Sequence, residues 1–85
     1  MTRCSSGKVV YHSFSLAEDA LIDAWIRNSY SMDNGPVNVY QCDDCGNFHF
    51  TSKGLINHRL KEQWDTGQIA RNRRAFELER KLRLR

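Results

Sequence analysis

The chain has 85 residues, of which 40% are hydrophobic and 11% aromatic, and its formal net charge is +3. This length predicts one small domain, and the apolar content excludes an intrinsically disordered chain. No apolar run approaches the roughly 20 residues that span a bilayer, and the first residues lack the apolar segment of a secretory signal. We therefore expect a cytoplasmic protein in a reducing compartment, where its three cysteines favour metal binding over disulfides.

The first half of the chain predicts a strand and a helix. Residues 8–12 are mostly β-branched or aromatic and indicate a short strand. Ser15 is followed three residues later by Glu18, which is the pattern of a capping box. This pattern predicts a helix over residues 16–30.

The second half predicts a hairpin and two helices. Residues 37–42 and 48–51 are expected to form the two strands, with a tight turn between them. A short helix over residues 55–64 follows, and a break around Gly67 separates it from a final helix over residues 68–84.

The most informative motif is Cys42-Asp43-Asp44-Cys45-Gly46. Two thiolates separated by two residues on a tight turn can chelate one tetrahedral metal ion. The same spacing also fits a redox dithiol, which usually begins a helix. Because Phe48-His49-Phe50 alternates as a strand does, we expect the hairpin tip to bind zinc.

Zinc then needs two further ligands, and Cys4 is the one remaining thiol. The fourth ligand is either His49, on the returning strand, or His58. Twelve residues separate Cys45 from His58, as in a C2H2 zinc finger. The second histidine of such a finger is missing, since its expected positions hold Glu62, Gln63 and Trp64. The spacing therefore favours His49 and leaves His58 open.

The hairpin region reads Val39-Tyr40-Gln41-Cys42-Asp43-Asp44-Cys45-Gly46-Asn47-Phe48-His49-Phe50-Thr51-Ser52-Lys53. It resembles small bacterial and phage zinc-ribbon-like proteins, whose pattern is roughly V-Y-x-C-x-x-C-G-x-W-H-L-T-S-K. The resemblance extends over roughly residues 4–53. Its further features are the early Cys4, the following Gly7-Lys8 and the alanine-rich helix. Phe48 and Phe50 replace the Trp and Leu of the pattern. The resemblance implies one zinc ion with the ligands Cys4, Cys42, Cys45 and His49, and implies little about function.

The sequence thus predicts an α+β fold in two parts. Residues 1–54 are expected to form a zinc-ribbon-like domain of a strand, a helix and a β-hairpin with a zinc knuckle. Residues 55–85 are expected to form a basic helical extension. A closed site of three thiolates and one imidazole leaves no position open for water, so we expect a structural zinc ion and no enzymatic activity.

Charge is unevenly distributed along the chain. Residues 1–50 carry three basic and six acidic side chains, whereas residues 51–85 carry ten basic and four acidic ones. A basic tail of this kind indicates a nucleic-acid contact, a charge-matched protein partner or a solvated helix. We predict a nucleic-acid-binding module. The residues expected to contact phosphates are Lys53, Arg59, Lys61, Arg71, Arg73 and Arg74.

The alternative hypothesis is a zinc-stapled protein-interaction module, such as an adaptor or inhibitor of phage origin. Ile22, Ile26 and Tyr30 form a second apolar face on the first predicted helix. We expect that face either to be covered within the chain or to meet a protein partner or a second copy of the chain. Neither hypothesis involves a membrane or a small-molecule substrate.

Overall fold

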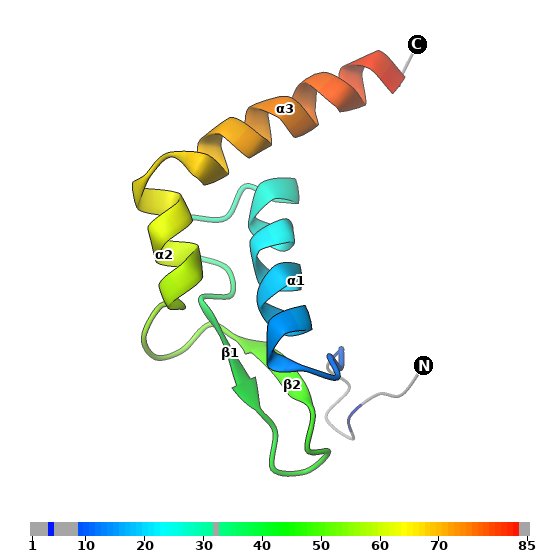
Figure 1. Cartoon of the computed structure of the whole chain (residues 1–85), viewed down its shortest axis with the longest axis vertical. Coiled ribbons are helices and arrows are strands. Elements are labelled where there is room, and N and C mark those ends of the chain that lie inside the picture. Colours follow the sequence, from blue (N-terminus) through cyan, green and yellow to red (C-terminus); the bar gives the residue numbers. More distant parts are fainter. Residues whose placement is uncertain (1–3, 5–8, 32, 84–85) are drawn as a thin grey trace.

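The computed structural model describes residues 4, 9–31 and 33–83. It has a small α+β fold, as predicted, with three helices and one two-stranded antiparallel hairpin in the described part. Helix α1 lies against the hairpin, and α3 projects from the opposite end of the molecule (Figure 1). None of the described helices has the length and apolarity of a bilayer-spanning segment. The elements are α1 (Phe14–Arg27), β1 (Asn38–Gln41), β2 (Phe48–Thr51), α2 (His58–Asp65) and α3 (Gln68–Arg83).

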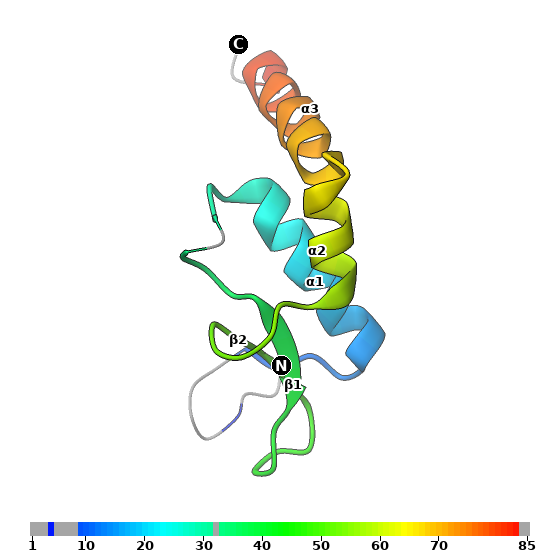
Figure 2. The ribbon, with the colours of Figure 1, turned by 90° about the vertical axis from the view of Figure 1, so that its left-hand side faces the viewer.

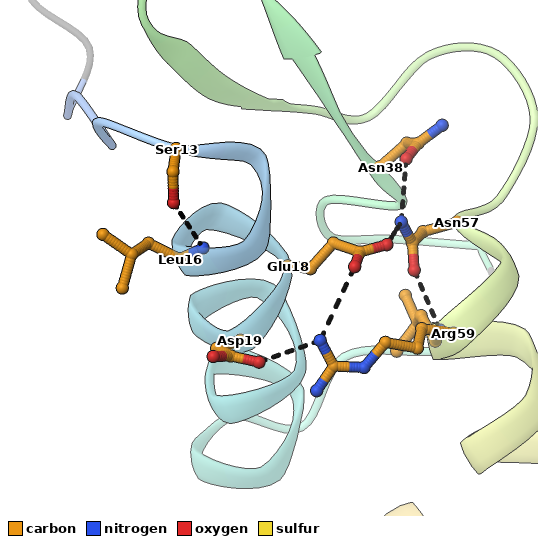
Figure 3. Close-up of polar contacts among 8 residues, drawn as sticks. Ser13, Leu16, Glu18, Asp19, Asn38, Asn57 and Arg59 are labelled. Carbon is orange, nitrogen blue, oxygen red and sulfur yellow. Dashed lines mark hydrogen bonds and ion pairs between the residues drawn. The ribbon is translucent and has the colours of Figure 1, made fainter.

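Helix α1 begins two residues earlier than the sequence predicts. Its N-cap is Ser13, whose Oγ accepts a hydrogen bond from the N–H of Leu16 at 3.1 Å (Figure 3). The predicted capping box of Ser15 and Glu18 is therefore wrong. Because the helix starts earlier, Phe14 lies edge-on to Phe48 of β2, with 6.0 Å between the ring centroids. Ser13 and Ser15 are equally good local caps, and this contact with β2 favours Ser13.

The same helix ends at Arg27 rather than near residue 30. Asn28 stops it, because its backbone is extended and both its backbone N–H and its side-chain amide donate to the carbonyl of Ala24, at 3.0 and 2.7 Å. This double hydrogen bond closes the last turn of α1.

The predicted strand over residues 8–12 is wrong in its extent, and residue 8 lies outside the described residues. In the described part of this segment Tyr11 forms an isolated bridge with Phe48, with both N–H to O distances at 2.9 Å. The carbonyl of Val9 accepts from the His49 ring instead of joining the ladder. The chain then bends at Ser13 into α1.

The hydrophobic core contains residues from every element except β2. Its centre is Trp25, which is fully buried and donates its indole N–H to the carbonyl of Pro36 at 2.6 Å. Both predicted segments, 1–54 and 55–85, contribute to this one core, and a domain boundary at residue 54 stays a prediction. The buried members are Ala17, Leu21, Ile22, Trp25, Val39, Leu60 and Ile69.

The second apolar face of α1 is covered within the chain. Ile22 is buried, and Ile26 and Tyr30 are half-buried and pack against the core. The ring of Tyr30 lies 5.9 Å from that of Trp25 in an edge-on arrangement. Of the two alternatives that the sequence leaves open for this face, the structure shows the one in which the chain itself covers it.

A buried amide joins three elements of the fold (Figure 3). Asn57 caps α2, because its Oδ1 accepts from the N–H of Leu60 at 3.0 Å. Its Nδ2 donates to Glu18 of α1 at 2.8 Å and to Asn38 of β1 at 3.3 Å. The sequence predicts that this helix begins at residue 55. The Asn57 cap explains why α2 begins at His58 instead.

Arg73 fixes the start of α3 against the end of α1. Its Nε donates to the carbonyl of Trp25 and its Nη2 to the carbonyl of Tyr30, both at 2.7 Å. Its guanidinium also lies over the rings of Trp25 and Trp64, at 5.9 and 5.5 Å. Because Trp25 stands in the last turn of α1, where carbonyls lack helical partners, this contact satisfies a backbone group and sets the direction of α3.

Arg73 and its neighbour Arg74 form a matched pair for testing this role. We expect Arg73→Ala to lower the free energy of unfolding by about 1–3 kcal/mol, because two partly buried backbone acceptors lose their donor. The exposed Arg74 should tolerate the same substitution within about 0.5 kcal/mol. Denaturant unfolding of both variants measures the difference, and equal effects would contradict the anchoring role.

Candidate metal centre

Four side chains from three separate segments meet beside the hairpin tip. Cys42 and Cys45 come from the turn between β1 and β2, His49 comes from β2, and Cys4 comes from the N-terminal segment. Their ligand atoms all lie within 4.8 Å of one another. Cys4 and His49 are buried, and Cys42 and Cys45 are half-buried. The group is consistent with one metal ion.

Two of the distances inside the group match a tetrahedral site. Bonds of about 2.3 Å to sulfur and about 2.0 Å to nitrogen place two sulfurs about 3.8 Å apart, and a sulfur and a nitrogen about 3.5 Å apart. The Sγ atoms of Cys4 and Cys42 lie 3.8 Å apart. The Sγ of Cys45 lies 3.4 Å from the Nε2 of His49. These two separations are those of neighbouring ligands around one tetrahedral metal ion.

The hairpin turn presents the two thiols of the C-x-x-C motif. The N–H of Cys42 donates to the carbonyl of Asn47 at 2.7 Å, and the N–H of Gly46 donates to the carbonyl of Cys42 at 2.9 Å. Gly46 has a φ of 73°, in the left-handed region that glycine adopts without strain. The turn is thus closed by its own backbone hydrogen bonds.

His49 is oriented by a second contact on the far side of its ring. Its Nδ1–H donates to the carbonyl of Val9 at 2.7 Å, which leaves the lone pair of Nε2 directed at the cysteines. Histidines that bind metal commonly make such a bond with their other nitrogen. The same Val9 carbonyl raises the pKa of His49 and outweighs burial, which alone would lower it, while the hydrogen bonds to Cys4 and Cys42 raise it further.

The surroundings of Cys45 disfavour its thiolate form by raising its pKa. The N–H of Asn47 lowers the pKa of Cys45, but burial and the hydrogen bonds to Cys4 and Cys42 raise it by more. A divalent cation reverses this preference, because thiolates and a neutral imidazole are the forms that bind metal. The chemistry of this donor set therefore suits zinc.

The other candidate ligand, His58, lies outside the group. It begins α2, its side chain is 95% exposed, and its Nε2 is 3.8 Å from a carboxylate oxygen of Glu62. The structure therefore brings His49, and not His58, to the three cysteines.

Three of the six basic residues predicted to contact phosphates are engaged within the fold. Arg59 pairs with Asp19 at 2.8 Å, a contact that raises its pKa further (Figure 3). Lys61 pairs with Asp65 at 2.8 Å, and Arg73 is the anchor of α3. The sequence does carry a signal for the role of Arg73, since it lies on the same helix face as the buried Ile69.

The remaining three, Lys53, Arg71 and Arg74, are exposed. Arg71 and Arg74 lie on α3, together with the exposed Arg80 and Lys81. Arg71 donates to Gln68 at 3.0 Å, a neutral partner that leaves the charge of its guanidinium uncompensated. Among the residues that the structure describes, the exposed positive charge is thus concentrated on α3.

Comparison of the chain with protein-family models, with curated proteins and with solved structures found no match. The resemblance to zinc-ribbon-like proteins therefore stays an expectation from sequence. The metal centre rests on its geometry.

Two histidine variants test the assignment of the fourth ligand. We expect native mass spectrometry to find one zinc ion on the wild-type chain and on His58→Ala. His49→Ala should lose stably bound zinc, because three thiolates alone do not complete the site. Retention of one zinc ion with unchanged affinity by His49→Ala would contradict the assignment.

Proposed function

We infer that this chain is a small structural-zinc protein, not an enzyme, that binds nucleic acid through α3. The observation that carries the proposal is the charge and position of this helix. It holds six basic and two acidic side chains, and it projects from the rest of the molecule in two perpendicular views (Figures 1 and 2). A projecting cationic helix is accessible to a polyanion along most of its length.

The proposed role of the zinc ion is to hold the scaffold together. Three thiolates and one imidazole fill a tetrahedral ion, and such closed sites are structural. The ion would join the segment at Cys4 to the hairpin, and its binding free energy would add to the stability of a small core. The hairpin, which carries three of the four ligands, stands at the end of the molecule away from α3 (Figure 1).

Phosphate contacts are assigned to Arg71, Arg74, Arg80 and Lys81, all exposed on α3. Arg73 contributes to the positive potential and is assigned no direct contact, since its guanidinium is held by the carbonyls of Trp25 and Tyr30. Contacts of this kind are independent of base sequence and release counterions, so the affinity falls steeply as salt is added.

A second candidate function is protein interaction. Leu78 and Leu82 are each 61% exposed on α3, and a purely electrostatic phosphate contact gives them no role. Exposed leucines in one stripe favour an apolar contact with another protein surface.

A pair of double variants tests the nucleic-acid proposal. Arg71→Ala with Arg74→Ala should weaken binding of a fluorescent oligonucleotide by about tenfold or more at low salt, and should reduce the salt slope by about two. Lys53→Ala with Lys61→Ala removes the same charge outside α3 and should change the affinity much less. Equal losses in both double variants, or none in the first, would contradict binding through α3.

A further inference from the structure

Helix α3 has two opposite faces. Its inner face contacts the body through Ile69, Arg73 and the half-buried Phe76. At about 100° per residue, Leu78 lies about 170° and Leu82 about 150° from the centre of that face. Together with the exposed Ala75 they form the outer stripe of α3, with spacings of three and four residues.

We propose that the outer stripe is the contact between two copies of this chain, which pair through parallel α3 helices. Spacings of three and four residues define positions a and d of a heptad, with Ala75 and Leu82 at a and Leu78 at d. Each leucine is 61% exposed in the single chain. Pairing would bury both against the same residues of the second copy.

The charges beside the stripe select the parallel orientation. Arg74 and Lys81 occupy the g positions on one flank, and Glu79 occupies an e position on the other. In a parallel pair a g residue meets the e residue five positions later in the partner helix. Arg74 therefore faces Glu79 of the second copy, and symmetry forms this pair twice. An antiparallel pair would instead oppose Arg74 to Lys81 of the second copy, which is repulsive.

The fold leaves room for this arrangement. Because each body is attached to the inner face of α3, two bodies would stand on the outer sides of the helix pair, and α3 extends beyond its own body (Figure 2). The contact begins at Ala75, since Arg71 occupies the preceding d position. It thus covers about two helical turns, which is smaller than a permanent interface and predicts reversible association.

Sedimentation velocity of the zinc-loaded full chain, without nucleic acid, tests the proposal. We expect a shift from monomer to dimer as concentration rises. Leu78→Ser with Leu82→Ser should keep the chain monomeric. Leu55→Ser is the matched control, because Leu55 is 87% exposed but lies outside α3, and it should dimerise as the wild type does. A wild-type chain that stays monomeric, or a stripe variant that still dimerises, overturns the proposal.

A charge exchange tests the parallel register. Arg74→Glu and Glu79→Arg should each weaken dimerisation by roughly tenfold, since each places like charges opposite one another twice. The double variant R74E/E79R restores opposite charges and should recover near wild-type dimerisation. A double variant that stays as weak as the single ones overturns the parallel pairing. Circular dichroism of every variant confirms that the fold is intact.

Discussion

Cys4, Cys42, Cys45 and His49 bring the N-terminal segment and the hairpin together at one site. A two-stranded hairpin is marginal in water when it stands alone. Here β1 and β2 pack on α1 at one face, while the bond between His49 and the Val9 carbonyl holds the N-terminal segment at the other. Because metal binding to such a site is also folding free energy, a zinc ion would compensate for a small core.

The candidate metal centre and the basic helix lie at opposite ends of the molecule. The metal centre lies beside the hairpin, whereas α3 extends from the opposite end (Figure 1). Arg73 fixes α3 to the body of the molecule, since it donates to the carbonyls of Trp25 and Tyr30. The two proposals for α3 are compatible, because a pair of parallel helices would present two basic surfaces to one polyanion and gain affinity through avidity. The repulsion between two cationic helices would in turn weaken on a nucleic acid.

Local sequence patterns could predict the hairpin and the α+β class, because strand alternation and a C-x-x-C turn are encoded within a few residues. They could also bring His49 forward as a ligand. Local patterns could not predict that Val9 lies outside a strand, because its carbonyl accepts a hydrogen bond from His49, 40 positions away. Nor could they choose Ser13 over Ser15 as the cap, since that choice depends on packing. The sequence predicts a phosphate contact for Arg73, because a helix sequence alone does not show that the carbonyls of Trp25 and Tyr30 will accept its hydrogen bonds.

The central claim is that three cysteines and one histidine bind a single zinc ion. X-ray absorption at the zinc edge, on the zinc-loaded full chain, tests it most directly. The account predicts three sulfur neighbours at about 2.3 Å and one nitrogen neighbour at about 2.0 Å, with no further light-atom ligand. A shell with two sulfurs, or one completed by water oxygen, would contradict both the ligand set and the structural role of the ion.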